Sequence, residues 1–336
     1  MRVLVIGLGS MGKRRVRCLQ ALGGQATYGF DLRADRVKEA KELYGIEAFS
    51  QFADAEREAR PEALVISVPP DQHMRYINYA IDKNLHYFVE ASVVDEGMRE
   101  AIDRLRAKKI VAAPSATMMF HPAIKMIAQI VKSGELGKLS NVILHSGQYL
   151  PDWHTYEKVS EYYVSNPPTG GGREIVPFEM TWFTMIFGFP KRVAGNFRKT
   201  IEIDGAGKID DTYNCLLDYG NFLAAVTVDV VSRYATRRFL INGEKKQLYW
   251  SWDEKAFKVF DPMKNAWEER KYEMAQAQQG YNPNIGENMY IEEIRNFIDA
   301  IAGKGEFINT MANDHNVLKI LYKIEQSDKS GMFIEV

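Results

Sequence analysis

Three glycines near the start of the chain follow the pattern G-x-G-x-x-G. They come directly after a short β-rich run, Arg2–Ile6, and open a segment whose apolar residues recur at helical spacing. There, the first glycine permits a tight turn, the second lets the backbone approach a pyrophosphate, and the third lets helix and strand pack closely. The pattern therefore predicts phosphate binding at the helix amino end rather than a turn without ligand. The residues predicted to line this turn are Gly7, Gly9, Ser10, Met11 and Gly12.

An acidic residue, Asp31, ends the second predicted strand roughly 20 residues after the glycine turn. At this position a carboxylate accepts hydrogen bonds from the adenosine ribose and repels a 2′-phosphate, so NAD is favoured over NADP. Leu32 follows in the same predicted adenosine site, and Arg33 and Arg36 leave the NADP alternative open, because a guanidinium can hold a 2′-phosphate. The other interpretation of both arginines is a solvated start of the next helix.

The elements that must position these residues alternate between strand and helix through the first third of the chain. Such alternation favours parallel strands joined by right-handed helical crossovers. The expected strands cover residues 2–6, 26–30, 63–68, 86–89 and 110–113, with helices between them.

The pattern changes after about residue 120, where long alternating segments with short turns indicate an antiparallel meander. We predict an α/β protein: an N-terminal Rossmann domain with a doubly wound parallel sheet at residues 1–120, and a C-terminal α/β domain at residues 121–336. The second domain has an open, mainly antiparallel sheet for substrate binding and oligomerisation, and the late helices are free to pack back on the first. Its expected strands are residues 141–150, 192–199, 212–219, 221–233, 238–241 and 247–252, and its helices are residues 123–132, 289–302 and 314–326.

The composition excludes several classes of function. The 336 residues are 46% hydrophobic and 26% charged with a net charge of −1, which gives no electrostatic reason to expect a nucleic-acid partner. No apolar run approaches the roughly 20 residues that span a bilayer, and the first residues form a strand rather than a signal peptide. The two cysteines, Cys18 and Cys215, lie far apart without metal-ligand spacing. We expect a reduced cytoplasmic protein without a metal site.

Several segments in order along nearly the whole chain resemble the Gfo/Idh/MocA (glucose–fructose oxidoreductase, inositol dehydrogenase, rhizopine catabolism) family. They are the glycine turn, a Ser-Val-Pro-Pro-Asp-Gln-His turn at residues 67–73, the segment 133–138, the glycine run 170–172 and the helix 292–301. The resemblance implies hydride transfer between nicotinamide and a sugar, cyclitol or related carbon, with oligomer contacts on the outer face of the second sheet. It also implies cofactor contacts from Ser67, Val68, Pro69, Pro70, His73, Glu90 and Ala91.

The chain departs from this family at two proton-handling positions. The family's Glu-Lys-Pro is Glu90-Ala91-Ser92 here, so an alanine replaces the lysine that helps proton transfer. The Asp…His pair that often follows the glycine run is also absent, because no histidine occurs there. Oxidation of an alcohol needs a base as well as a hydride acceptor. Either the chemistry has moved to other residues or it has been lost.

A loop rich in aromatic and hydrogen-bonding residues offers a replacement. Such groups suit the apolar face and the hydroxyls of a sugar, and His154 can exchange a proton near neutral pH. Asp152 could orient His154 if the segment stays extended; the alternative for His154 is a surface histidine. The predicted substrate contacts in this loop are Tyr149, Asp152, Trp153 and Tyr156.

Further candidates lie at and after the glycine run. Arg173 could clamp a carboxylate or phosphate with its planar fork, and Glu174 could bind hydroxyls or compensate the helix dipole. Glu179 becomes a possible base if burial raises its pKa. Tyr163 is a further candidate for proton transfer, with a buried aromatic residue as the alternative.

The sequence thus favours an NAD-dependent dehydrogenase or reductase acting on a sugar, amino sugar or nucleotide sugar, as a homodimer or homotetramer. One alternative is a redox-neutral enzyme, an epimerase or glycosidase that takes a hydride and returns it. The other is a non-catalytic NAD-binding regulatory subunit, which the two missing proton-handling residues would allow.

Overall fold

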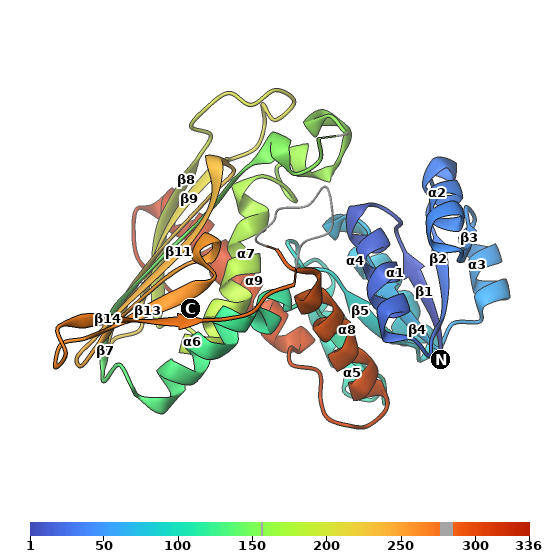
Figure 1. The fold of residues 1–336 in the computed structure, drawn as a ribbon. Coiled ribbons are helices and arrows are strands. Elements are labelled where there is room, and N and C mark those ends of the chain that lie inside the picture. Colours follow the sequence, from blue (N-terminus) through green and yellow to red (C-terminus); the bar gives the residue numbers. More distant parts are fainter. Residues whose placement is uncertain (156, 276–284) are drawn as a thin grey trace. The chain divides into compact units, whose positions relative to one another are not determined.

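The computed structural model describes residues 1–155, 157–275 and 285–336, and these form two compact units (Figure 1). The first unit contains residues 1–117 and 288–315, and the second contains residues 118–287 and 316–336. Among the described residues, no helix combines the length and apolar character needed to cross a bilayer.

The first unit is built on a six-stranded parallel sheet with the order β3-β2-β1-β4-β5-β6. This order and the α/β alternation confirm the predicted Rossmann sheet. Strands β1 and β4 are almost completely buried, as expected for parallel strands covered on both faces. The strands are β1 (Arg2–Ile6), β2 (Ala26–Phe30), β3 (Glu47–Phe49), β4 (Ala63–Ile66), β5 (His86–Val89) and β6 (Ala112–Pro114). The helices are α1 (Ser10–Leu22), α2 (Ala34–Tyr44), α3 (Phe52–Ala59), α4 (His73–Lys83), α5 (Met98–Leu105) and α8 (Glu287–Ile301).

From β1 the sheet is extended in one direction by β2 and β3, and from β4 it is extended in the opposite direction by β5 and β6. The boundary between β1 and β4 indicates where the cofactor site lies. In open α/β sheets a ligand binds outside the carboxyl ends of the strands at such a point. The glycine turn follows β1, residues 67–73 follow β4, Asp31 follows β2 and Glu90 follows β5. All four predicted cofactor segments therefore leave the same edge of the sheet.

The second unit is built on a nine-stranded sheet with the order β14-β13-β12-β11-β7-β10-β9-β8-β15. The β7–β10 pair is parallel and the other pairs are antiparallel, which confirms the predicted mainly antiparallel sheet. The strands are β7 (Leu139–Tyr149), β8 (Arg192–Arg198), β9 (Thr212–Asp218), β10 (Leu223–Asp229), β11 (Val231–Gly243), β12 (Gln247–Ser251), β13 (Ala256–Asp261), β14 (Ala266–Lys271) and β15 (Ile334–Glu335).

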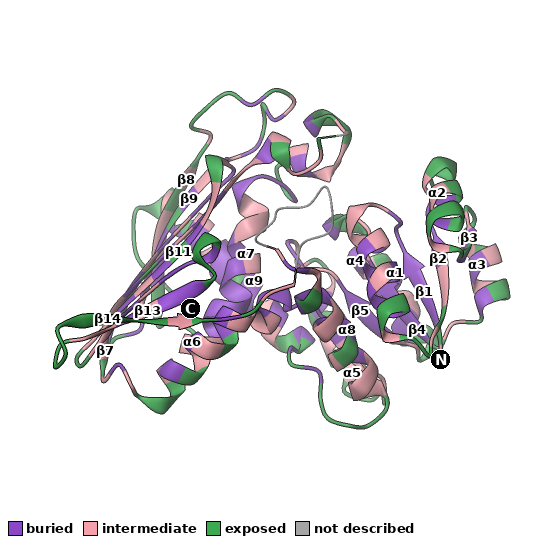
Figure 2. Ribbon diagram, in the orientation of Figure 1, coloured by how far each residue is buried: buried purple, intermediate pink, exposed green. Residues whose placement is uncertain are grey.

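Helices α6 (Pro122–Ser133), α7 (Gly172–Phe187) and α9 (Met311–Ser330) supply the apolar partners for one face of this sheet. Inward-facing strand residues and residues of all three helices share one hydrophobic cluster, and strand residues on this face are buried in Figure 2. Fully buried members include Trp182 from α7, Ile320 from α9 and Phe239 from β11. Burial of this apolar surface is the main force that holds the layers together.

Two differences from the expected elements have identifiable causes. Residues 221–233 were expected to form one strand, but Asp229 ends β10 by accepting hydrogen bonds from the backbone N–H groups of Val231 and Ser232. This local side-chain turn competes with continued strand pairing. Strand β14, which sequence reasoning missed, is an exposed edge strand with four consecutive charged residues, so it lacks the alternation of a half-buried strand.

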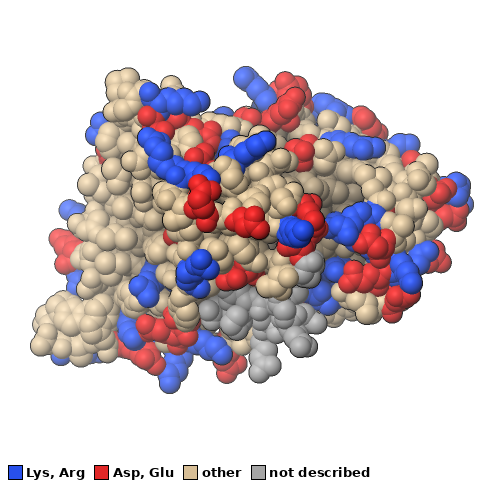
Figure 3. Space-filling view, turned by 90° about the horizontal axis from the view of Figure 1, so that it is seen from above, with Lys and Arg blue, Asp and Glu red and all other residues tan. Residues whose placement is uncertain are grey.

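Charged side chains of both signs are scattered over one face of the molecule (Figure 3). On the face shown in Figure 3, lysine and arginine side chains are interspersed with aspartate and glutamate. That face presents no extended field of one sign, in keeping with a net charge of −1.

Candidate functional site

The turn between β1 and α1 is shaped so that only glycine fits at two of its positions. Gly7 has φ +88°, and a Cβ built on it would lie 2.5 Å from the carbonyl oxygen of Ser67. A Cβ on Gly12 would lie 1.7 Å from the carbonyl oxygen of Gly7. At Gly9 the nearest neighbour is the flexible guanidinium of Arg36, 3.3 Å away. Backbone packing therefore does not require glycine at this position, unlike at Gly7 and Gly12.

The amino end of α1 is built to receive an anion. Its N-cap is Gly9, and no side chain caps the helix among the described residues. Ser10 and Met11 begin the first turn, where backbone N–H groups lack intrahelical partners. Together with the positive end of the helix dipole, these groups suit a pyrophosphate. The residues present fit the phosphates of NAD.

The carboxylate of Asp31 is held in place by two backbone N–H groups. Leu8 donates to Oδ2 at 2.7 Å and Arg33 donates to Oδ1 at 2.9 Å. The Arg36 guanidinium lies 3.7 Å from Oδ2, and Arg33 forms an ion pair with Asp35. Arg33 and Arg36, which made NADP binding possible on the sequence alone, therefore each contact a carboxylate of the protein. Leu32, next to Asp31, is 75% exposed.

We expect Asp31→Ala to lower NAD affinity by at least about tenfold, roughly 1.4 kcal/mol, because the ribose hydroxyls lose a charged acceptor. NADP affinity should rise relative to NAD, because a negative charge is removed and Arg36 loses its carboxylate partner. Titration calorimetry with both cofactors measures this shift. Asp35→Ala, on the surface nearby, is the matched control, and equal NAD affinity for both variants would contradict the role of Asp31.

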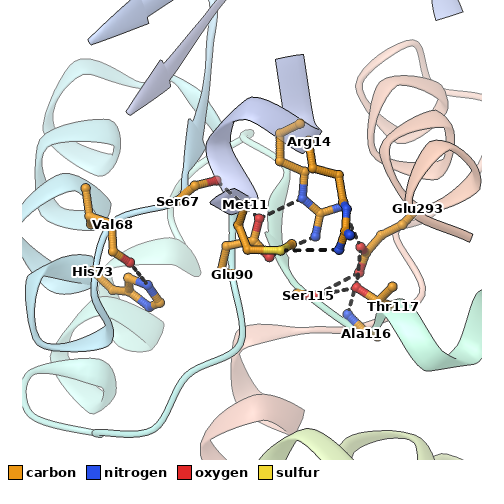
Figure 4. A network of polar contacts seen from close by, with 11 residues as sticks. Met11, Arg14, Ser67, Val68, His73, Glu90, Ser115, Ala116, Thr117 and Glu293 are labelled. Atoms are coloured by element: carbon orange, nitrogen blue, oxygen red, sulfur yellow. Dashed lines mark hydrogen bonds and ion pairs between the residues drawn. The ribbon is translucent and has the colours of Figure 1, made fainter. Parts of the chain in front are cut away.

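The turn after β4 is fixed by a buried histidine. The Nε2 of His73 lies 3.0 Å from the carbonyl oxygen of Val68 (Figure 4). Burial lowers the pKa of His73 to about 4, so the ring is neutral near pH 7 and its Nε2–H donates to that carbonyl. Pro69 and Pro70 lie between the two residues, and Pro70 begins a short 3₁₀ helix. The hydrogen bond holds this proline turn at the carboxyl end of β4.

Glu90 follows β5 and is bound by an arginine that sequence reasoning missed. Arg15 Nε lies 2.6 Å from Glu90 Oε1 and Arg15 Nη2 lies 2.8 Å from Oε2, while Ser67 Oγ donates to Oε1 at 3.2 Å. Arg15 Nη1 also lies 2.8 Å from Glu293 on α8, and Arg15 and Glu293 are fully buried. Ala91 comes directly after this network. A signal was present, since Arg15 shares one helix face with buried Leu19.

The Glu293 carboxylate is bound by three groups that follow β6 as well as by Arg15. It accepts hydrogen bonds from the hydroxyl groups of Ser115 and Thr117 and from the backbone N–H of Ala116 (Figure 4). Together with Arg15, these donors satisfy a charge that would be very costly to bury alone. Helix α8 is thereby tied to the end of β6.

In the second unit, the predicted base His154 has a different neighbour from the one expected. Its ring stacks on Tyr162 with a centroid separation of 4.7 Å, and its Nδ1 lies 3.6 Å from Glu157 Oε2. Asp152 is exposed and does not orient it, because residues 150–152 form a 3₁₀ turn rather than the extended segment that this pairing needed. Tyr149 packs against the guanidinium of Arg233. Tyr156, a predicted substrate contact, lies outside the described residues.

Tyr163 and Glu174 form a direct hydrogen bond that spacing alone could not predict. The Tyr163 hydroxyl donates to Glu174 Oε1 at 2.6 Å. Burial raises the pKa of Glu174 to about 7, and the tyrosine hydrogen bond partly opposes this shift. The second carboxylate oxygen is buried without a hydrogen-bond partner among the described residues. The indole Nε1 of Trp153, in the same loop region, is buried in the same unpaired state.

Two other predicted site residues are engaged by the protein itself. Glu179 is fully buried and contacts Ser146, Trp182 and Arg237, so its carboxylate joins α7 to the sheet. Arg173 directs its fork to Glu325 of α9 at 2.6 Å. Arg173 therefore binds a carboxylate of the protein itself, where an anionic group of the substrate was predicted.

The strand order, the glycine turn and the fixed Asp31 carboxylate define the first unit as a dinucleotide-binding Rossmann domain. Comparison with known families gives the same class. Residues 1–109 match the model described as "Oxidoreductase family, NAD-binding Rossmann fold". Residues 124–249 match the "GFO/IDH/MocA C-terminal domain". The chain belongs to the Gfo/Idh/MocA oxidoreductase family, as its motifs predicted.

Similar proteins agree with this family. The uncharacterized oxidoreductase YhhX of Escherichia coli (strain K12) is 22% identical over 184 residues, which cover 54% of this chain and 50% of YhhX. The match therefore spans about half the length of that relative. A levoglucosan dehydrogenase solved with NADH and levoglucosan has a TM-score of 0.83 and 16% identity, covering 99% of this chain and 98% of that chain. An oxidoreductase from Agrobacterium radiobacter, solved with NAD+, L-tartaric acid and magnesium, has a TM-score of 0.85 and 13% identity, with coverage of 99% and 97%.

These comparisons confirm the NAD-binding fold that was predicted from the glycine turn and Asp31, and the oxidoreductase class that the family resemblance implied. At such low identities the solved structures establish the fold alone. The roles of the individual site residues stay predictions.

Proposed function

We propose that this protein is an NAD-dependent dehydrogenase or reductase that acts on a hydroxyl or keto carbon of a sugar, amino sugar or nucleotide sugar. The observation that carries the proposal is the glycine turn, in which Gly9 stays open to a ligand although the fold does not require glycine there. Bound NAD supplies the hydride acceptor or donor. Gly7, Gly9 and Gly12 would admit its pyrophosphate, and Asp31 would bind its adenosine ribose.

The second unit supports a polyhydroxylated substrate. Trp153 and Glu174 present a buried donor and a buried acceptor without partners among the described residues, and Tyr162 and Tyr163 supply aromatic surface beside them. A sugar offers hydroxyls for the polar atoms and an apolar face for the rings. The ligands named with the similar structures, levoglucosan and L-tartaric acid, are also hydroxyl-bearing small molecules.

The test is incubation of the purified protein with NAD and a panel of sugars, amino sugars and nucleotide sugars. Reduced-nicotinamide absorbance and product mass are followed together. A rise in absorbance with a product two hydrogens lighter supports a dehydrogenase. A changed product without absorbance supports the redox-neutral alternative. NAD binding with neither change across the panel contradicts the proposal and favours the regulatory subunit.

We also propose that the outer face of the nine-stranded sheet joins copies of this chain. The residue pairing places an apolar row across neighbouring strands on the face opposite the helices. Two large aliphatic residues of this row, Ile143 and Leu216, are 46% and 51% exposed, on either side of Ala225. The row consists of Tyr249, Leu240, Ile143, Ala225, Leu216 and Ala194.

We expect Ile143→Glu to dissociate a dimer or tetramer into smaller species, because the charge would be buried without a partner in the apolar row. Size-exclusion chromatography with light scattering gives the mass. Met263→Glu is the control, since Met263 is 93% exposed at a strand turn and lies outside the row. A monomeric unmodified protein at micromolar concentration would refute this assembly.

A further inference from the structure

The loss of the family lysine leaves the proposed reaction without an obvious base, and the second unit contains a group with suitable properties. Glu174 lies in the first turn of α7, with one carboxylate oxygen held by Tyr163 and the other buried without a partner among the described residues. A buried acceptor without a hydrogen bond costs free energy in the empty protein. A ligand that donates a hydrogen bond to this oxygen would remove that cost.

We propose that Glu174 is the proton acceptor for the substrate hydroxyl that is oxidised, and that Tyr163 is its positioning residue. This inference rests on the proposed dehydrogenase function and deepens it. Trp153, whose buried Nε1 also lacks a partner, would donate to a second oxygen of the same substrate. A donor on the aromatic loop and an acceptor in the first turn of α7 match a ligand with several hydroxyls, such as a sugar.

The step balances in both protons and electrons. With NAD bound as the hydride acceptor, the C–H bonding pair would leave the substrate carbon as a hydride, and the O–H bonding pair would become the second bond of the carbonyl. The hydroxyl proton goes to Oε2 of Glu174. In the reverse reaction the protonated Glu174 returns this proton to the carbonyl oxygen. No further oxidant or reductant is needed.

The surroundings of Glu174 explain why a carboxylate can serve near neutral pH. Burial disfavours its charged form, and the hydrogen bond from Tyr163 on the adjacent 3₁₀ turn opposes that effect in part. On α7 itself, the neighbouring Arg173 turns away to Glu325. Tyr162 contacts Tyr163 edge-on and carries the stacked ring of His154. A base with a pKa of about 7 combines adequate strength with a populated ionised form.

The test compares Glu174→Gln, Tyr163→Phe and His154→Gln on whichever substrate the panel identifies. We expect Glu174→Gln to lower kcat by about 100-fold or more, with unchanged NADH binding measured by fluorescence. The unmodified enzyme should oxidise faster as pH rises through about 7, because its base must be ionised. Tyr163→Phe should shift this rise in rate to higher pH, because it removes the hydrogen bond that favours the ionised form of Glu174. Glu174→Gln should abolish the rise. Glu161→Gln, an exposed glutamate of the same loop, is the matched control and should leave rate and profile unchanged.

A second readout does not depend on activity. Because the pKa of Glu174 is raised in the folded protein, its ionisation destabilises the fold as pH rises from about 4.5 to about 7. The melting temperature of the unmodified protein should therefore fall across this range relative to that of Glu174→Gln, and the difference should stay constant above it. If the melting temperatures of the two proteins changed with pH in the same way, the raised pKa of Glu174 would be contradicted.

The two proposals fail in different ways. Full turnover by Glu174→Gln, with loss of turnover in His154→Gln, would overturn the assignment to Glu174 while the dehydrogenase function stands. An unmodified protein that binds NAD and transforms no member of the panel would overturn the function and this inference together.

Discussion

Arg15→Met is expected to destabilise the first unit by about 3–5 kcal/mol, the effect of removing one partner from a buried ion pair. The Arg15 guanidinium lies between Glu90 and Glu293 and is completely buried, as is Glu293. Methionine keeps most of the apolar stem, so the loss reports on the charge rather than on packing. Two carboxylates would be left without their shared cation. Urea unfolding followed by circular dichroism measures the change in the free energy of unfolding.

Lys13→Met is the matched control on the same helix. Lys13 forms an ion pair with Glu39 at 2.8 Å, but Glu39 is 40% exposed, and such pairs contribute about 0–1 kcal/mol. Combining Arg15→Met with Glu90→Gln tests the coupling directly, and we expect the pair to interact by at least about 1 kcal/mol in a double-mutant cycle. Equal costs for Arg15→Met and Lys13→Met would refute the buried network.

Gly12→Ala should abolish measurable NAD binding and destabilise the fold by about 1–3 kcal/mol, the usual range for overpacking. The new Cβ would lie 1.7 Å from the carbonyl oxygen of Gly7, a backbone atom that no side-chain rotation can move away. Helix α1 would have to shift from the strand, and its amino end would no longer point at the phosphates. NADH fluorescence titration and thermal melting measure the two effects.

Gly9→Ala separates ligand binding from folding at the same turn. Its Cβ would contact the flexible guanidinium of Arg36 at 3.3 Å, so stability should change little. NAD affinity should nevertheless fall by about tenfold or more, since the pyrophosphate needs close approach of the backbone. Gly207→Ala is the control, because it has no neighbour within 4 Å of the added Cβ. If Gly9→Ala binds NAD as well as Gly207→Ala does, the turn is not the phosphate site.

The sequence predicted the first unit better than the second because parallel strands carry strong local signals. Strands β1, β2 and β5 were predicted with their observed bounds, since each is a short apolar run bounded by polar or glycine residues. Strand β3 and helix α3 were missed: the strand has only three residues, and the helix is short and exposed on much of its surface. The parallel β7–β10 pair inside an otherwise antiparallel sheet depends on contacts between distant segments, which periodicity does not report.

The residues of the candidate site were likewise predicted only where local sequence signals identify them. The cofactor residues follow fixed spacing from a turn, so their types and positions along the chain were sufficient to place them. Arg15 was missed, because its partners Glu90 and Glu293 lie 75 and 278 residues away along the chain, and only folding brings the three residues together. His154 attracted attention through its chemistry, while the Tyr163–Glu174 hydrogen bond depended on how the loop packs against α7.

The network around Glu293 has a consequence for synthesis on the ribosome. Arg15 and residues 115–117 emerge early, but the carboxylate that binds them belongs to α8, near the end of the chain. At typical elongation rates of about 5–20 residues per second, the nascent first unit waits on the order of ten seconds or more for this helix. During that interval Arg15 lacks one of its two carboxylates, and residues 115–117 lack the acceptor of their hydrogen bonds. The chain is thus most exposed to misassembly while the second unit is being made, and a messenger truncated before α8 would encode a first unit that cannot complete its own core.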